Sequence, residues 1–282
     1  MEIGEGVSIL LLGASGLCGS YIKEYLSKKG YRVTGTYHRM CGEYEKDSSM
    51  IQFSVEDGEK IQAILRSSAP QVIISCLRGQ FQRQLEIYKI LSEYVSKSES
   101  RRLIYFSTAN VFDGAQGCVH YEMDETKAVS LYGRFKRDCE KLLQEKLGKQ
   151  AVILRISMVW DRDCPRLKEW EQNILSHRSQ TVYKNYFLNL TVPEQIARYI
   201  CNILSRDLTG IFHVGTLDTI EHIELYRQLM EKWKGRDVKL QIGEELSKPE
   251  YLAVLPSRED VPKELDWKIQ QVIDIVKGRQ PM

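Results

Sequence analysis

Tyr132 and Lys136 are a pair of residues that could move a proton during catalysis. They stand four positions apart, so on a helix their side chains lie on the same face. A tyrosine has an ordinary pKa of ~10 and is a poor acid or base at neutral pH. A neighbouring lysine ammonium favours the phenolate and lowers that pKa. The pair therefore suits the reduction of a carbonyl, in which a side chain must protonate the forming alkoxide.

The position of this pair in the chain gives it more weight than its spacing does. The same spacing recurs at Tyr25 and Lys29, where we expect no chemistry. Tyr132, in contrast, opens an expected helix that follows a strand at 103–107, and Thr108 comes directly after this strand. Ligands of open α/β sheets bind at the carboxyl ends of the strands. Thr108 is therefore a third candidate residue for the same site.

A glycine-rich turn near the start of the chain predicts a dinucleotide site. The apolar strand Val7–Leu12 runs into the sequence GASGLCG at 13–19 and then into a helix. Glycines in this turn allow the backbone to approach a pyrophosphate closely, and the helix N-terminus attracts its negative charge. We expect cofactor contacts from Gly13, Ser15, Gly16, Leu17 and Cys18.

The end of the second expected strand favours NADPH over NADH. An NAD-binding protein usually places Asp or Glu there to bind the ribose hydroxyls. Here the strand at 32–37 is followed by His38 and Arg39, and no carboxylate comes before Glu43. Arginine can grip a 2′-phosphate through charge-assisted hydrogen bonds; the alternative is a solvated basic loop. At the end of the fourth strand we expect further cofactor contacts from Cys76, Leu77 and Arg78.

The elements that must position these residues alternate between short apolar runs and amphipathic patterns. This alternation predicts an α/β fold, a Rossmann-type doubly wound parallel sheet, over residues 1–160. The expected strands are Val7–Leu12, Arg32–Tyr37, Ile51–Phe53, Val72–Cys76, Leu103–Ser107 and Ala151–Ile156. The expected helices are Gly16–Lys29, Asp57–Ser67, Gln80–Ser96 and Leu131–Leu147.

Residues 161–282 predict a smaller α/β substrate lobe whose chain interleaves with the first domain. Its expected helices are Arg166–His177, Val192–Ser205, Ile220–Trp233 and Ile269–Lys277, with short strands at Thr181–Lys184 and Ile211–Val214. The helix from Val192 shows a clear apolar stripe.

Composition and charge exclude several classes of protein. The chain has 40 basic and 38 acidic residues and a net charge of +2, which argues against a nucleic-acid or membrane-binding surface. No apolar run approaches the ~20 residues of a membrane span, and the start lacks the pattern of a secretion signal. Seven cysteines without C-x-x-C spacing are typical of reduced thiols. We therefore expect a cytoplasmic protein with no disulfide frame and no metal site.

Four segments of the chain resemble the dTDP-4-dehydrorhamnose reductase family of extended short-chain dehydrogenases, and they occur in the family's order. STANVFDG at 107–114 resembles that family's STDYVFDG, and YGRFK at 132–136 resembles its YGxxK. LRISMV at 154–159 is similar to LRTSWV, and GIFH at 210–213 is similar to GIYH. The resemblance extends through about His213 and is loose beyond it.

The resemblance implies a role for each candidate residue. Thr108 would hydrogen-bond the substrate carbonyl, and Tyr132 would donate the proton. Lys136 would tune Tyr132 and hold the cofactor, while NADPH gives a hydride to C4 of a nucleotide-linked keto sugar. Substrate contacts are expected from Thr108, Asn110, Phe112, Met158 and Trp160. The alternative is that Tyr132 and Lys136 are ordinary helix residues.

Departures from the family pattern leave other functions open. Arg78 brings a charge near the nicotinamide end, Ala109-Asn110 replaces Asp-Tyr, and Met158 replaces a tryptophan. These changes suit a non-catalytic, cofactor-bound regulatory subunit similar to the β subunit of methionine adenosyltransferase. A sugar-nucleotide dehydratase is disfavoured, because Ala109 and Asn110 cannot supply the acid–base pair of a dehydration. A sugar-nucleotide epimerase remains an alternative, although such enzymes usually retain NAD and the second expected strand lacks the carboxylate that binds NAD. The expected protein partner is either a second copy of the chain or another enzyme.

Overall fold

The computed structural model describes residues 6–39, 42–233, 236–244 and 246–278. The chain forms two compact units, which we call unit 1 and unit 2. Unit 1 comprises Met1–Thr108, Arg134–Leu154 and Ile196–Phe212; unit 2 comprises Ala109–Gly133, Arg155–Gln195 and His213–Met282. The chain passes back and forth between them, so a single boundary at residue 160 does not separate the units.

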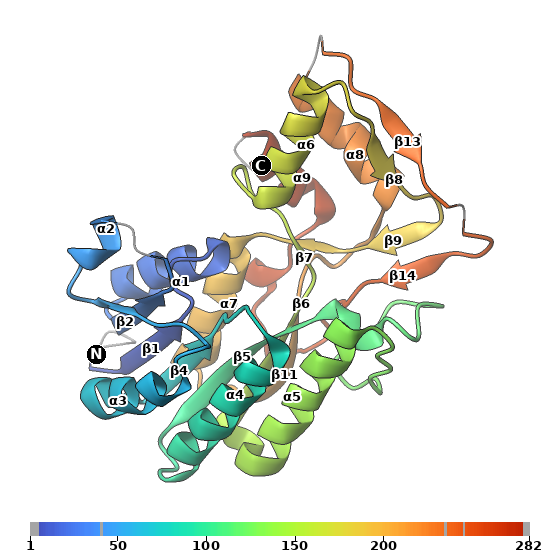
Figure 1. Cartoon of the computed structure of the whole chain (residues 1–282). Helices are drawn as coiled ribbons and strands as arrows, with labels where there is room; N and C mark the ends of the chain where they lie inside the picture. Colours follow the sequence, from blue (N-terminus) through green and yellow to red (C-terminus); the bar gives the residue numbers. More distant parts are fainter. Residues whose placement is uncertain (1–5, 40–41, 234–235, 245, 279–282) are drawn as a thin grey trace. The chain divides into compact units, whose positions relative to one another are not determined.

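One seven-stranded sheet, in the order β11-β6-β5-β4-β1-β2-β3, organises the first unit (Figure 1). β1 pairs in parallel with β2 on one side, where Ile9 lies opposite Val33, and with β4 on the other, where Ile9 lies opposite Val72. The strand order therefore reverses between β1 and β4, as in a doubly wound sheet. This confirms the predicted fold class. The strands are β1 Ser8–Leu12, β2 Arg32–Tyr37, β3 Met50–Gln52, β4 Val72–Ser75, β5 Arg102–Thr108, β6 Ala151–Ile156 and β11 Gly210–Val214.

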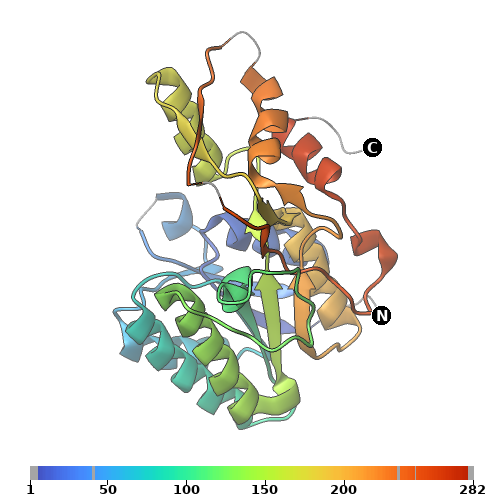
Figure 2. The ribbon, with the colours of Figure 1, turned by 90° about the vertical axis from the view of Figure 1, so that its right-hand side faces the viewer.

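Helices cover both faces of this sheet (Figures 1 and 2). α3, α4 and α5 lie on one face, where their apolar stripes bury one set of alternate strand residues, including Leu10, Leu12 and Tyr105. α1 and α7 lie on the other face. The helices are α1 Leu17–Lys28, α2 Gly42–Glu45, α3 Gly58–Ser68, α4 Phe81–Ser96, α5 Leu131–Leu147 and α7 Pro193–Ser205.

The local sequence explains why these elements form. In β1 every residue from Ile9 to Leu12 is buried, as expected for a strand covered on both faces. In α4 the buried side chains recur at helical spacing, from Gln84 through Tyr88 and Leu91 to Val95. β11 is the main surprise: it was expected in the smaller lobe, but it extends the large sheet beside β6.

Unit 2 consists of short strands and helices. The described strands pair as β7 with β10, as β12-β9-β14, and as β8 with β13. The expected helix at 220–233 is wrong in its bounds, because the chain there forms β12, then α8, then a 3-10 helix at Glu231–Trp233. The strands are β7 Met158–Val159, β8 Gln180–Val182, β9 Tyr186–Leu188, β10 Leu190–Thr191, β12 Ile220–Glu221, β13 Leu240–Ile242 and β14 Glu250–Leu252. The helices are α6 Pro165–Leu175, α8 His222–Met230 and α9 Ile269–Lys277.

Aromatic side chains form the centre of unit 2. The ring of Trp170 lies 4.6 Å from that of Tyr226 and 4.5 Å from that of Trp233, both edge-on. Trp160 reaches Tyr226 from another side at 5.9 Å. The chain has four tryptophans, and the fourth, Trp267, also belongs to this unit and is buried.

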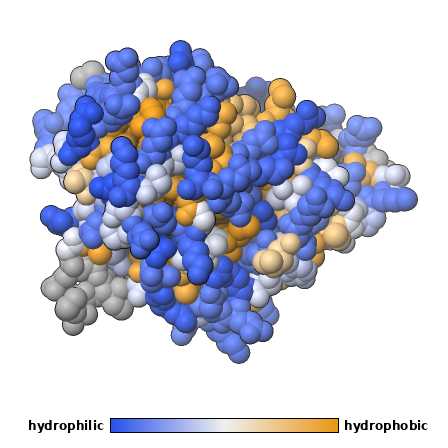
Figure 3. Space-filling model, turned by 90° about the horizontal axis from the view of Figure 1, so that it is seen from below, coloured by the Kyte–Doolittle hydropathy of each residue, from blue (hydrophilic) through white to orange (hydrophobic). Residues whose placement is uncertain are grey.

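Hydrophilic residues predominate on the face drawn in Figure 3, with hydrophobic ones between them. Among the residues that the structure describes, no helix has both the length and the apolar character needed to cross a bilayer. The same residues contain no group of three or more His, Cys, Asp or Glu placed to hold a metal ion. Six cysteines are free thiols, and Cys41 lies outside the described residues.

Candidate cofactor and catalytic site

The glycine-rich turn after β1 is built against the end of β4. Gly13 has a φ of +83°, and a Cβ there would lie 3.0 Å from the carbonyl oxygen of Cys76. The Cys76 amide in turn donates to Leu12 O at 2.9 Å, and the Gly13 amide donates to Thr36 Oγ1 at 2.9 Å. Glycine is therefore required at position 13 by both its backbone angle and its neighbour.

The turn leads directly into the N-terminus of α1. Gly16 is the cap residue, and it offers no side-chain acceptor to the first N–H groups of the helix. Gly19 allows the helix to pack on the turn, since a Cβ there would lie 2.8 Å from Ala14 Cα. Helix N–H groups without an internal partner form an anion site. Ser15, Leu17 and Cys18 are half-buried around this turn. Their contact with a phosphate stays a prediction.

His38 and Arg39 directly follow β2, and both are exposed. The preceding Tyr37 is buried, and its ring stacks on that of Tyr44 at 5.7 Å. The end of β2 therefore presents two basic side chains to solvent beside the glycine-rich turn. Their contact with a cofactor stays a prediction.

The end of β4 carries the three other predicted cofactor residues. Cys76 and Leu77 are half-buried and Arg78 is exposed. Burial, followed by the charge of Cys18, raises the pKa of the Cys76 thiol well above its ordinary value. This thiol is therefore neutral at physiological pH and acts as a small apolar group.

The last residues of β5 are tied to α5 by buried polar contacts. The Ser107 hydroxyl donates to the Glu140 carboxylate, and the Lys136 ammonium donates to Phe106 O at 2.7 Å. Thr108, the next residue, is 9% exposed. Two of the three predicted catalytic residues, Thr108 and Lys136, thus belong to one strand–helix pair in unit 1.

Lys136 is unusually placed for a charged side chain. It is 6% exposed, and its ammonium lies 4.8 Å from the centre of the Tyr105 ring. Burial lowers the pKa of Lys136 to about 8, although Cys139, Cys76 and Glu140 act in the opposite direction. Buried lysines with a lowered pKa are frequent at functional sites.

Tyr132 lies in the first turn of α5, one turn before Lys136, and its side chain is 40% exposed. Asp113 fixes the start of this helix. Its carboxylate accepts the Val129 amide at 2.6 Å and the Ser130 amide at 3.3 Å, and it also accepts the Ser130 hydroxyl. The Ser130 hydroxyl oxygen accepts the Gly133 amide at 2.9 Å. Sequence reasoning missed Asp113 and Ser130, although a serine directly before a helix is a recognisable capping signal.

The four expected substrate residues outside the catalytic set differ in how deeply their side chains are buried. Asn110 and Met158 are half-buried. Phe112 is 1% exposed, and Trp160 is fully buried in the aromatic centre. The substrate contacts stay a prediction, and the burial of Phe112 and Trp160 favours a packing role for these two.

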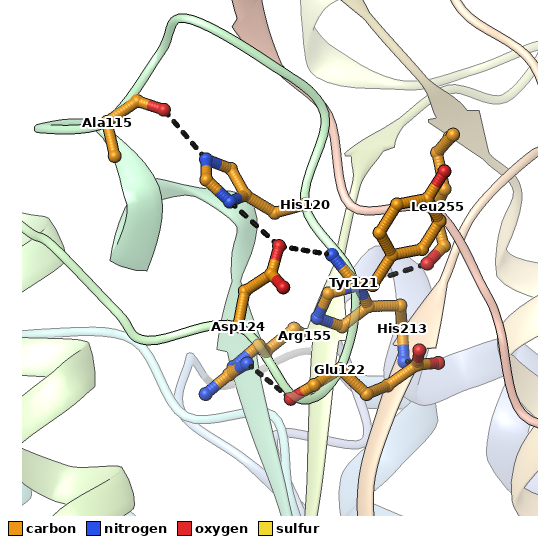
Figure 4. Close-up of polar contacts among 8 residues, drawn as sticks. All are labelled: Ala115, His120, Tyr121, Glu122, Asp124, Arg155, His213 and Leu255. Carbon is orange, nitrogen blue, oxygen red and sulfur yellow. Dashed lines mark hydrogen bonds and ion pairs between the residues drawn. The ribbon is translucent and has the colours of Figure 1, made fainter.

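His120, Glu122, Arg155 and His213 belong to a buried polar network in unit 2 (Figure 4). None of them was predicted as a site residue. His120 stacks on Phe112 at 4.1 Å, its Nε2 donates to Ala115 O at 2.7 Å, and its Nδ1 contacts Asp124 at 3.2 Å. Arg155 donates to Glu122 O at 3.2 Å.

The Glu122 carboxylate holds three segments of this network together. It accepts the His213 amide at 3.1 Å and the Ser257 hydroxyl at 2.6 Å. His213 is buried, and its Nδ1 contacts Leu255 O at 3.2 Å. Burial and then the charge of Arg155 lower the pKa of His213 to about 3. His213 is therefore a neutral structural residue.

Comparison with known proteins places these features in a family context. The family model described as the RmlD substrate binding domain matches residues 84–257. A curated dTDP-4-dehydrorhamnose reductase from Sinorhizobium fredii is 30% identical over 128 residues, which cover 40% of this chain and 40% of the relative. The chain thus matches about two fifths of the length of that curated relative.

Solved structures resemble the chain over most of its length. The dTDP-glucose 4,6-dehydratase of Bacillus anthracis, in complex with NAD, has a TM-score of 0.79 at 14% identity and covers 97% of this chain and 96% of its own. The dTDP-4-dehydrorhamnose reductase of the same organism, in complex with NADP, has a TM-score of 0.69 at 17% identity, with 89% and 91% covered. At these identities the likeness establishes the fold.

Proposed function

Because the chain belongs to the RmlD substrate-binding-domain family, we propose that it is an NADPH-dependent reductase of a nucleotide-linked 4-keto sugar. The observation that carries this proposal is Lys136, buried and bonded to the end of β5, one helical turn after Tyr132. The tight turn at Gly13 and the uncapped start of α1 fit a dinucleotide pyrophosphate.

The residues at the strand ends fit NADPH. Gly13 to Cys18 would cradle the pyrophosphate, and His38 and Arg39 would bind the 2′-phosphate. The B. anthracis dTDP-4-dehydrorhamnose reductase in complex with NADP supports this choice of cofactor. Bound NADPH supplies a hydride to the carbonyl carbon of the sugar.

The chain's own residues would supply the proton and orient the reacting groups. Tyr132 would donate its phenolic proton to the oxygen of the former carbonyl, and solvent would then restore it. The Lys136 ammonium stabilises the resulting phenolate. Thr108 would donate a hydrogen bond to the same oxygen. In sum, a keto sugar, NADPH and one proton give a hydroxy sugar and NADP⁺.

The proposal is tested first by calorimetric titration with NADPH and NADH. We expect NADPH to bind more tightly than NADH. Arg39→Ala should weaken NADPH binding by about tenfold or more and leave the affinity for NADH unchanged. Lys28→Ala, which removes a surface cation paired with Glu24, is the matched control. Equal affinity for both nucleotides in the wild-type protein contradicts the assignment of NADPH.

Turnover is then measured as NADPH oxidation with dTDP- and UDP-linked 4-keto sugars. Steady oxidation that Tyr132→Phe abolishes supports a reductase. Tight NADPH binding without turnover of any of these substrates rejects the reductase and favours the regulatory subunit, whose partner enzyme a pull-down would then recover.

A further inference from the structure

Glu140 is a buried carboxylate to which the proposed reaction assigns no role. It is 2% exposed and lies one helical turn after Lys136 on α5. A buried carboxylate is costly unless it is hydrogen-bonded and balanced by a positive charge. Its surroundings therefore indicate what it does.

Glu140 contacts the end of β5 through Ser107. The Ser107 hydroxyl, 4% exposed, donates to Glu140 Oε1. The residue before Ser107 is Phe106, whose carbonyl accepts the Lys136 ammonium at 2.7 Å. The residue after it is Thr108. The Glu140 carboxylate thus holds Ser107 in place. Ser107 lies between Phe106, which accepts the Lys136 ammonium, and Thr108, which is expected to bind the substrate carbonyl.

Glu140 is also one of the groups that act on the charge of the Lys136 ammonium. The groups that face this ammonium come from three elements: Cys139 and Glu140 of α5, Tyr105 of β5, and Cys76 and Arg78 after β4. Burial raises the pKa of Cys139 to about 11 and raises those of Cys76 and Tyr105 well above their ordinary values. These three groups are neutral at physiological pH, and Arg78 is positive, so among the groups named here the carboxylate of Glu140 is the one that can offset the charge of Lys136.

We propose that Glu140 is a positioning residue, whose carboxylate keeps the Lys136 ammonium charged and, through Ser107, holds the end of β5 in register with α5. Its importance for catalysis rests on the proposed function. Its effect on Lys136 does not, because that effect exists in the protein without cofactor or substrate.

Two substitutions separate the charge of Glu140 from its hydrogen bond. Glu140→Gln keeps an oxygen that accepts the Ser107 hydroxyl but removes the charge. Ser107→Ala keeps the charge but removes the hydrogen bond. If Glu140 has a merely structural role, both variants should change the protonation of Lys136 to a similar degree. The proposed role predicts that Glu140→Gln changes it and Ser107→Ala does not.

The first measurement is the protonation of Lys136 in the full chain without cofactor. The Cε signals of 13C-labelled lysines are followed by NMR against pH, and the Lys136 signal is assigned with Lys136→Arg. We expect a wild-type midpoint near 8, a midpoint lower by about one pH unit in Glu140→Gln, and no change in Ser107→Ala. An unchanged midpoint in Glu140→Gln overturns the proposal, as does an equal shift in Ser107→Ala.

A second variant keeps this test decisive if Glu140→Gln does not fold by circular dichroism. Glu140→Asp retains the charge but withdraws it by one methylene, so it should lower the midpoint by a smaller amount. No shift in Glu140→Asp would then overturn the proposal.

The second measurement is the pH dependence of NADPH oxidation by the folded variants. Glu140→Gln should move the alkaline limb of kcat to lower pH by the same amount as the NMR midpoint. Ser107→Ala should lower kcat without moving that limb. If no substrate is turned over, the reductase assignment fails while the NMR result still decides the role of Glu140.

Discussion

Gly133, the residue after Tyr132, packs directly against the backbone carbonyl of Asn110. A Cβ at position 133 would overlap this oxygen and would also lie 2.8 Å from Asp113 Oδ2. The first turn of α5 can therefore approach the segment after β5 only if residue 133 has no side chain. The close approach explains the glycine of the YGxxK pattern by packing.

Gly133→Ala should displace the first turn of α5 and destabilise the protein. Overpacking of this kind costs about 1–3 kcal/mol, and turnover should fall further because Tyr132 moves with the turn. The control is Gly117→Ala, where a Cβ has nothing within 4 Å. Urea unfolding and NADPH oxidation check the prediction, and equal stability of the two variants would contradict it.

Asp113→Ala should loosen the start of the same helix. The variant leaves the Val129 and Ser130 amides without their acceptor, and the loss of hydrogen bonds to a charged acceptor costs about 1–2 kcal/mol. Asp138→Asn, an exposed change on the same helix, should leave stability within about 0.5 kcal/mol of the wild type. The measurement is urea unfolding, and the idea fails if both variants unfold at the same concentration.

Tyr132→Phe should lower kcat by about 100-fold or more, because the substitution removes the proton donor. NADPH affinity should change little, since the ring and the neighbouring Lys136 remain. Tyr121→Phe is the matched control, because Tyr121 is exposed to a similar degree, 42% against 40%. Stopped-flow and steady-state NADPH oxidation measure the effect, and substantial turnover by Tyr132→Phe would assign the proton to another group.

Acid should destabilise unit 2 through His213. Its pKa is lowered from 6.5 to about 3 in the folded protein, so between these pH values the unfolded chain binds more protons than the folded one. Stability is therefore fully present above pH 6.5 and is lost as the pH falls toward 3. His222, whose pKa burial lowers to about 4, acts in the same direction.

His213→Gln should flatten this pH dependence, because glutamine can still donate to Leu255 O but does not titrate. The midpoint of thermal unfolding, measured from pH 7 to pH 4, should fall less steeply in this variant than in the wild type. His177→Asn, at an exposed residue with a φ of +54°, should leave the slope unchanged. Identical slopes in His213→Gln and wild type would exclude His213 as the source.

The sequence predicted several elements of the large sheet, and one helix of unit 2, well. β2, β6, α5 and α9 have the predicted bounds, and β1 differs from the prediction by one residue. β1 is an apolar buried strand, and α5 and α9 are amphipathic helices; both patterns leave a strong signal in the sequence.

Most of unit 2 could not be predicted in this way. Strands such as β7 and β10, with two residues each, are too short to show any period. The place of β11 was also missed, because its pairing with β6 is set by contacts far apart in the chain.

The candidate site was predicted only in part, because some of its contacts join residues that are far apart in the chain. Motif residues such as Gly13 and Tyr132 could be recognised from local order. Glu140 and Glu122 could not, because their partners Ser107 and Ser257 are distant in sequence. Phe112 belongs to a recognisable motif, yet its burial against His120 shows that a motif does not tell which way a side chain points.

The confinement of all four tryptophans to unit 2 gives the protein a built-in spectroscopic label. Selectively excited tryptophan fluorescence reports on that unit alone, while far-ultraviolet circular dichroism reports on the backbone of both units. Denaturation followed by the two signals therefore separates the units without any engineered dye. Coincident curves mean that the interleaved chain unfolds as one cooperative system, and an earlier fluorescence transition means that the tryptophan-bearing unit opens first.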